Sequence, residues 1–363
     1  MAPLYHALRG LQHQFDVKVC VTAQHREMLD QVLEVFDIVP DIDLNLMRKG
    51  QDLFDVTSSV LLGMRSVIAT EHPDLLLVHG DTTTSMAAAL AGFYSGTPVG
   101  HVEAGLRTFN VQSPFPEEFN RQVTSKIARW HFAPTPEARN NLVAEGIPEH
   151  AIQVTGNTVI DALQWTLDRL HSSPERMERV ASVLGACLPF DCTQQDFVLI
   201  TGHRRENFGE GFLQIGQALH DLAVRYPQIA FVYPVHLNPN VQEPVIAALA
   251  GLANVHLISP LGYEPFVHLL RHCLLVLTDS GGIQEEAPGL GKPVVLMRDT
   301  TERPEAVQAG TVWMVGADRH KIVDAVSMLI DSPSRYQAMA HAHNPYGDGH
   351  ACAAITNMLQ RIL

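Results

Sequence analysis

Short apolar runs alternate with helical patterns along most of the chain. An apolar run at 17–23 precedes a helical pattern at 26–36 and a longer one at 52–70. The run "DLLLVHG" at 74–80 and the helical pattern at 83–95 continue this alternation. Continuous apolar runs separated by amphipathic segments are typical of strands that are buried on both faces of a parallel sheet. The pattern therefore predicts an α/β fold of the doubly wound type.

The alternation is interrupted once, at 158–192, where the sequence is typical of a helix and a polar connection. It resumes with "FVLITGHRRE" at 197–206. Because 363 residues exceed what one hydrophobic core usually serves, two domains are expected. We predict a Rossmann-like domain at 1–165 and a Rossmann-like nucleotide-binding domain at 166–345, with a last helix at 346–363 that can pack back on the first.

Composition narrows the class of protein. A chain with 46% hydrophobic and 18% charged residues is globular, and a net charge of -14 argues against a nucleic-acid partner. The longest apolar runs, such as "LLLV" at 75–78, are far below the ~20 residues of a membrane span, so no membrane partner is expected. The cysteines lack the spacing of a zinc site or a disulfide framework, which predicts reduced thiols, a cytoplasmic location and no metal site.

Polar residues follow several predicted strands at their carboxyl ends, where open α/β sheets bind ligands. Asp81 and Glu103 follow strands in the first half of the chain. His203, Arg204 and His236 follow strands in the second half. Each one alone can also be a strand-end cap or a buried, hydrogen-bonded group. Together they predict a ligand site, which we expect in the cleft between the two domains.

The stretch "TDSGGIQEEAPGLGKPVVL" at 278–296 starts a helix directly after a strand. The free N–H groups and the dipole of a helix start suit a phosphate near Ser280, Gly281 and Gly282. A carboxylate one to two turns into the helix, such as Glu286, can accept the hydroxyls of a ribose. The alternative is a glycine-initiated helix with acidic first-turn residues, which we expect to stop at the following proline. No GxGxxG fingerprint or P-loop is present, so no cofactor is expected.

Two further carboxylates, Glu117 and Glu118, follow Pro116 at a predicted helix start. Acidic residues at that position are favoured by the helix dipole, so capping alone explains either of them.

Motifs spread over nearly the whole chain resemble those of the bacterial non-hydrolysing UDP-N-acetylglucosamine 2-epimerases. They are "AQHREMLDQVL" (23–33), "HGDTTT" (79–84), "GHVEAGLRT" (100–108), "PFPEEFNR" (114–121), "GNTVIDAL" (156–163), "TGHRREN" (201–207), "PVHLNPNV" (234–241), the stretch at 278–294 and "RDTTERPEA" (298–306). The resemblance implies a GT-B-like pair of Rossmann-type domains and a homodimer. It also implies reversible conversion of UDP-N-acetylglucosamine to UDP-N-acetylmannosamine for surface polysaccharide synthesis, through elimination of UDP and its addition back.

The resemblance implies a role for each matching position. Asp81, Glu103 and Glu117 match the acid and base carboxylates, and the mutual repulsion of clustered carboxylates would help one of them to act as an acid. His203 matches a catalytic residue, and His203 and Arg204 both match the family's contacts to the diphosphate.

Further matches concern the nucleotide and an activator. Ser280, Gly281 and Gly282 match the diphosphate loop, and Glu286 matches the ribose-binding carboxylate. Phe266 is a candidate for packing against uracil, with a core aromatic as the alternative. A regulatory site for UDP-N-acetylglucosamine as an activator is implied at the matching residues, which are Gln24, His25, Arg204 and His236.

The start of the chain departs from the family pattern. "APLYHALRGLQHQF" at 2–15 has a helical face at positions 4, 8, 11 and 15, but no strand precedes it. Family members open with a strand and a "GTRPE"-type loop, so we expect Met1 to be an internal methionine. A truncated, inactive nucleotide-sugar binder therefore stays open as an alternative. A GT-B glycosyltransferase is a second alternative, because the same kind of cleft binds a nucleotide sugar. Hydrolysing epimerases share motifs but commonly carry a kinase domain, for which this sequence has no room.

Overall fold

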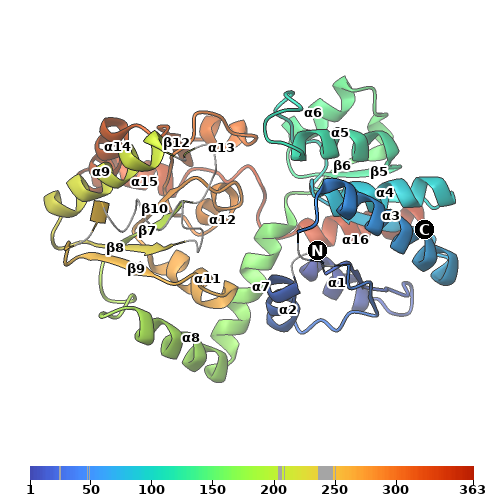
Figure 1. The fold of residues 1–363 in the computed structure, drawn as a ribbon, viewed down its shortest axis with the longest axis horizontal. Helices are drawn as coiled ribbons and strands as arrows, with labels where there is room; N and C mark the ends of the chain where they lie inside the picture. Colours follow the sequence, from blue (N-terminus) through green and yellow to red (C-terminus); the bar gives the residue numbers. More distant parts are fainter. Residues whose placement is uncertain are drawn as a thin grey trace. The chain divides into compact units, whose positions relative to one another are not determined.

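A computed structural model describes residues 1–363 except for 24–25, 47, 49, 203–206, 208, 236–247 and 250. The chain divides into two compact units. The first unit contains Met1–Ala162 and Tyr346–Leu363, and the second contains Leu163–Pro345. Figure 1 shows the course of the chain through both units.

The first unit is built on a four-stranded parallel sheet in the order β3-β4-β5-β6, and a separate parallel pair joins β1 to β2. The strands are β1 (Cys20–Val21), β2 (Ile42–Asp43), β3 (Leu76–His79), β4 (Val99–Val102), β5 (Trp130–Ala133) and β6 (Ile152–Val154). The helices are α1 (Ala2–Arg9), α2 (Arg26–Val35), α3 (Leu53–Glu71), α4 (Thr83–Ser95), α5 (Glu117–Ile127), α6 (Pro136–Ala144), the 3-10 helix η1 (Glu149–Ala151) and α16 (Ala351–Ile362). Helix α7 (Thr158–Ser172) begins in this unit and continues into the second.

Helix α3 begins with a capping box and has an apolar stripe along one side. The Asp52 carboxylate accepts from the backbone N–H of Asp55, whose own carboxylate accepts from the N–H of Asp52. Within the described part of the chain, α3 is the one helix that length and composition alone would allow to cross a membrane, which is weak evidence for a span. One side of α3, including Val60 and Met64, packs in the same core as Ala87 of α4.

Helix α16, the last in the chain, packs on α1 in the first unit (Figure 1). Leu4 and Leu8 of α1 share a core with Ile355 of α16. The start of α16 is capped from a distance, because the Asp161 carboxylate accepts from the backbone N–H groups of Ala351 and Cys352 at 3.2 and 2.8 Å. The two ends of this unit's sequence are thereby joined.

The second unit contains a six-stranded parallel sheet in the order β12-β11-β10-β7-β8-β9. The strands are β7 (Phe197–Thr201), β8 (Ala230–Pro234), β9 (Val255–Ile258), β10 (Leu275–Thr278), β11 (Val294–Leu296) and β12 (Val312–Met314). The helices are α8 (Pro174–Cys187), α9 (Glu210–Arg225), α11 (Tyr263–His272), α12 (Ile283–Gly289), α13 (Pro304–Gln308), α14 (Arg319–Asp331) and α15 (Pro333–Ala340). Strands such as β7 and β10 are almost fully buried, which accounts for their continuous apolar runs.

The strand order reverses between β7 and β10. From β7 the chain moves outward through β8 to β9, and it then returns to place β10 on the other side of β7. Such a reversal opens a crevice beyond the carboxyl ends of the two strands, where ligands of doubly wound sheets bind. Gly202 follows β7 at this point and Ser280 follows β10 closely.

The helices predicted at 26–36, 52–70 and 83–95 are confirmed as α2, α3 and α4. The strand predicted at 17–23 is wrong in length, since only Cys20–Val21 pairs in a sheet. The helical face predicted up to position 15 is also too long. The helix ends at Arg9, because Gly10 is a poor helix former and turns follow it.

Candidate active site

Two carboxylates lie at one edge of the first sheet. Asp81 follows β3 and Glu103 follows β4, and these neighbouring parallel strands end together because His79 is paired with Val102. Glu103 has a φ of 65°, in the left-handed region that residues other than glycine rarely adopt. Such a conformation costs of order 1 kcal/mol and recurs at functional sites, so the backbone itself aims this side chain.

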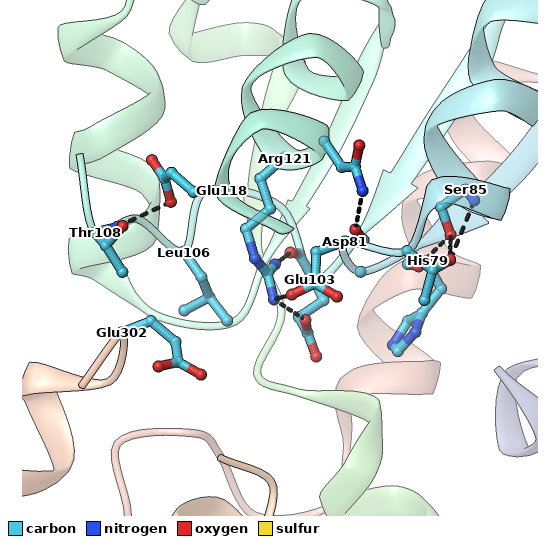
Figure 2. Close-up of polar contacts among 12 residues, drawn as sticks. His79, Asp81, Ser85, Glu103, Leu106, Thr108, Glu118, Arg121 and Glu302 are labelled. Atoms are coloured by element: carbon cyan, nitrogen blue, oxygen red, sulfur yellow. Dashed lines mark hydrogen bonds and ion pairs between the residues drawn. The ribbon is translucent and has the colours of Figure 1, made fainter. Parts of the chain in front are cut away.

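Arg121 of α5 joins the two carboxylates (Figure 2). Its Nη2 lies 2.5 Å from Oδ2 of Asp81 and 2.9 Å from Oε1 of Glu103, and its Nη1 donates to the Glu103 carbonyl at 3.2 Å. The Arg121 side chain is only 5% exposed. A buried guanidinium requires anionic partners, and its charge offsets the repulsion that we expected between the clustered carboxylates.

Two amide side chains complete the frame around these carboxylates. Nδ2 of Asn120, on α5, donates to the Asp81 carbonyl at 2.8 Å. Nδ2 of Asn157, at the start of α7, donates to Oε2 of Glu103 at 3.2 Å. Both amides are buried, so they hold the strand ends without water between them. The sequence reasoning identified neither these residues nor Arg121, whose only signal is its place one turn after Glu117 on a helix.

The adjacent glutamates at the start of α5 have different environments. The Glu118 carboxylate is 1% exposed and accepts from the backbone N–H groups of Thr108 and Phe109 at 2.9 and 3.2 Å. Glu118 therefore anchors the loop that follows β4. Oε2 of Glu117 is buried and has no hydrogen-bond partner among the described residues. A buried polar oxygen in this state is available to a ligand.

The predicted phosphate loop lies after β10 in the second unit. The backbone N–H of Ser280 donates to the Thr278 hydroxyl at 2.9 Å, which tightens the turn into α12. A side chain at Gly281 would place its first carbon 2.8 Å from the guanidinium of Arg303, so a larger residue there would have to displace that guanidinium. The expectation that α12 stops at Pro288 is wrong, because the proline lies inside the helix, which ends at Gly289.

Helix α12 carries a second pair of adjacent glutamates with different environments. Glu285 is paired with the Arg303 side chain. Glu286 instead accepts from the hydroxyl of Tyr263 at 3.0 Å. Burial, with a smaller contribution from the charge of Glu285, raises the pKa of Glu286 to about 7, and the Tyr263 hydrogen bond opposes this rise. Glu286 is thus the carboxyl group of the pair that titrates near neutrality.

A pocket of about 220 Å³ opens beyond the carboxyl ends of β7, β8 and β9. Its lining residues are Thr201, Gly202, Pro234, Pro260, Leu261, Phe266, Ser280 and Ile283. The lining is mostly apolar with a few polar groups, as in many small-molecule pockets. The predicted residues Phe266 and Ser280 lie here together. A larger cavity of about 480 Å³, between α7 and α11, contains none of the predicted residues.

Several predicted residues cannot be placed. Gln24, His25, His203, Arg204 and His236 lie outside the described residues, so their roles stay predictions. Within the described ranges, no group of three or more histidine, cysteine, aspartate or glutamate side chains could hold a metal ion.

Comparisons with known proteins agree with the motif pattern. The family model described as UDP-N-acetylglucosamine 2-epimerase matches residues 9–360. The UDP-N-acetylglucosamine 2-epimerase of Yersinia pestis is 56% identical over 360 residues, covering 99% of this chain and 94% of that protein. The Escherichia coli K12 enzyme of the same name is also 56% identical, with the same coverage.

Solved structures are similar over the same length. The Neisseria meningitidis UDP-GlcNAc 2-epimerase bound to UDP-GlcNAc has a TM-score of 0.93 and 49% identity, covering 99% of this chain and 96% of that chain. The Methanocaldococcus jannaschii enzyme in complex with UDP-GlcNAc and UDP has a TM-score of 0.84 and 31% identity, covering 99% and 95%. The predicted fold class, two Rossmann-like domains of the GT-B type, is confirmed.

Substitutions of the two glutamates at the start of α5 should differ in their effect on stability. Glu118→Gln removes a charged acceptor from two backbone N–H groups and should lower the free energy of unfolding by about 1–3 kcal/mol. Glu117→Gln, the matched control, should change it by less than about 0.5 kcal/mol because one oxygen of Glu117 has no partner to lose. Urea unfolding at pH 7.5 measures both values. Equal losses in the two variants would contradict this division.

Proposed function

The chain belongs to the UDP-N-acetylglucosamine 2-epimerase family, and we propose that it inverts C2 of the sugar by releasing UDP and adding it back. It is an isomerase that epimerises UDP-N-acetylglucosamine at C2, which gives UDP-N-acetylmannosamine. This membership also removes the GT-B glycosyltransferase from consideration. The observation that carries the mechanism is the pair of carboxylates, Asp81 and Glu103, held by one buried arginine.

The chemistry of C2 favours elimination. The C2 proton is not next to a carbonyl group, so removing it to leave a free carbanion faces a large barrier. When a base takes this proton, the C–H electron pair forms the C1=C2 double bond and UDP leaves C1 with the C–O bonding pair. The products are 2-acetamidoglucal and UDP. In the second half UDP adds back to C1 and an acid protonates C2 on the opposite face, so the atoms balance and no oxidant is required.

Inversion requires proton transfer on two faces of the sugar, and therefore two competent groups. We assign Asp81, Glu103 and Glu117 to this task. The frame around Asp81 and Glu103 supports a fixed orientation, because rigid donors hold both side chains. The unpartnered oxygen of Glu117 supports a proton-transfer role on other grounds, since it can take or give a proton without breaking an existing hydrogen bond. His203 is assigned as a further catalytic residue from its motif.

The second unit is assigned to UDP. Ser280, Gly281 and Gly282 bind the diphosphate. The space beside Gly282 is open, which leaves room for close approach to its backbone. Glu286 accepts the ribose hydroxyls, and Phe266 packs against uracil in the pocket that it lines. Arg204 is assigned to the diphosphate from its motif. These contacts would hold the leaving UDP for its return.

The remaining assignments follow from the family resemblance. UDP-N-acetylglucosamine serves as an activator as well as a substrate, through a regulatory site of Gln24, His25, Arg204 and His236. The enzyme acts as a cytoplasmic homodimer, and its product supplies surface polysaccharide synthesis.

Epimerisation in D2O tests the elimination route. The protein is incubated with UDP-N-acetylglucosamine and C2 is followed by NMR. We expect UDP-N-acetylmannosamine with deuterium at C2, and a rate at least ~100-fold lower in Glu103→Gln because a proton-transfer group is lost. The exposed Glu149→Gln serves as the matched control and should keep the wild-type rate.

Three outcomes would contradict parts of this proposal. Product without deuterium would show that C2 gains no proton from the solvent, which contradicts the proposed elimination route. Free N-acetylmannosamine with UDP would indicate hydrolysis. No product from a folded protein would indicate a nucleotide-sugar binder.

Activation by substrate predicts a particular rate law. The initial rate should depend sigmoidally on the UDP-N-acetylglucosamine concentration, because one molecule must bind to activate the turnover of another. His25→Ala should reduce the sigmoidicity more than it reduces the rate at saturation. Initial rates measured free of product check this, and a hyperbolic curve for the unmodified protein would exclude the activator site.

A further inference from the structure

Tyr263 is the first residue of α11, and its hydroxyl points to the Glu286 carboxylate on α12. The hydroxyl donates to Oε1 of Glu286 at 3.0 Å. Burial raises the pKa of Tyr263 well above its ordinary value, and the nearby charge of Glu286 adds to this rise. The phenol therefore keeps its proton near neutral pH and acts as the donor.

Glu286 depends on this donor to stay ionised. The side chain is 8% exposed, and burial disfavours its charge first, followed by the charge of its neighbour Glu285. The Arg303 side chain is paired with Glu285. The hydrogen bond from Tyr263 is the interaction that favours the charged form of Glu286.

Helix α11 holds Tyr263 in place and also carries a wall of the pocket. Nη1 of Arg176, on α8, lies 2.7 Å from Oε1 of Glu264, and both side chains are mostly buried. Val267 of the same helix is fully buried. Phe266, three residues after Tyr263 and thus on the same helix face, lines the pocket of about 220 Å³. One rigid helix therefore fixes both the donor to Glu286 and the pocket aromatic.

We propose that Tyr263 is a positioning residue, which holds the Glu286 carboxylate ionised and oriented to accept the two hydroxyls of a ribose. This inference rests on the proposed binding of UDP by the second unit. An ionised carboxylate is acceptor-only and offers about four lone-pair sites. With Tyr263 on Oε1, Oε2 and the remaining site on Oε1 are left for a cis-diol. A protonated carboxyl group would present its own O–H and lose one of these sites.

The pH dependence of KM separates this role from a merely structural one. UDP-N-acetylglucosamine is the probe, because its diphosphate is esterified at both ends and does not titrate near neutrality. KM and kcat are measured from pH 6 to 9 for the wild type, Tyr263→Phe, Glu286→Gln and the control Tyr336→Phe. Tyr336 is also partly buried, but its hydroxyl donates to the backbone carbonyl of Leu274.

The sign of the effect follows from the charge of Glu286. In the wild type, KM should rise as the pH falls through about 7, where Glu286 becomes protonated. Without the tyrosine donor the charged form is less favoured, so the rise in Tyr263→Phe should begin about one pH unit higher. KM at pH 7 should increase about fivefold, kcat should stay within about twofold, and the difference should shrink at pH 9. Tyr336→Phe should follow the wild type, and Glu286→Gln should lose this pH dependence.

Two results would overturn the inference. One is a Tyr263→Phe profile that superimposes on the wild type, and the other is a loss of the same size at every pH, which would indicate a packing role. If the wild type binds UDP-N-acetylglucosamine but forms no product, the proposed catalysis fails separately. Calorimetric affinities at the same pH values then replace KM and test Tyr263 by the same comparison. A wild type that binds no UDP-N-acetylglucosamine would refute both.

Discussion

The buried ion pairs of Arg121 are the interaction on which the first unit's site depends. The guanidinium joins carboxylates from two adjacent strand ends, and the helix that carries it packs beside them. A charge that is almost fully removed from water is tolerated only with anionic partners, so Arg121, Asp81 and Glu103 must be placed together or not at all. The parallel register of β3 and β4 makes this possible, because it ends both strands at the same edge.

Each of the two units contains one pair of adjacent glutamates with different environments. At the start of α5, Glu118 is bound to backbone N–H groups while one oxygen of Glu117 is unpartnered among the described residues. On α12, Glu285 is paired with an arginine while Glu286 has a tyrosine donor and a pKa near neutrality. In each pair one carboxylate binds backbone N–H groups or an arginine, and its neighbour is the one that we propose to contact the ligand. This division lets an acidic helix start serve structure and chemistry together.

The sequence predicted the features that local pattern determines. Apolar runs and helical periodicity were enough for the alternating strands and helices, and the motifs were enough for the family. Arg121 and Tyr263 were missed because their roles depend on which side chains the fold brings together across 18 to 40 residues, and no local pattern encodes that. For the same reason, the sequence could not decide which member of each glutamate pair is structural.

The most direct test of this account is a double-mutant cycle on kcat for UDP-N-acetylglucosamine epimerisation with Arg121→Gln, Glu103→Gln and the double variant. If Arg121 acts by holding the carboxylates, each single change should lower kcat by ~100-fold or more, and the double variant should lose little beyond the worse single one. Losses that multiply in the double variant would contradict the account, as would an Arg121→Gln protein with the wild-type kcat.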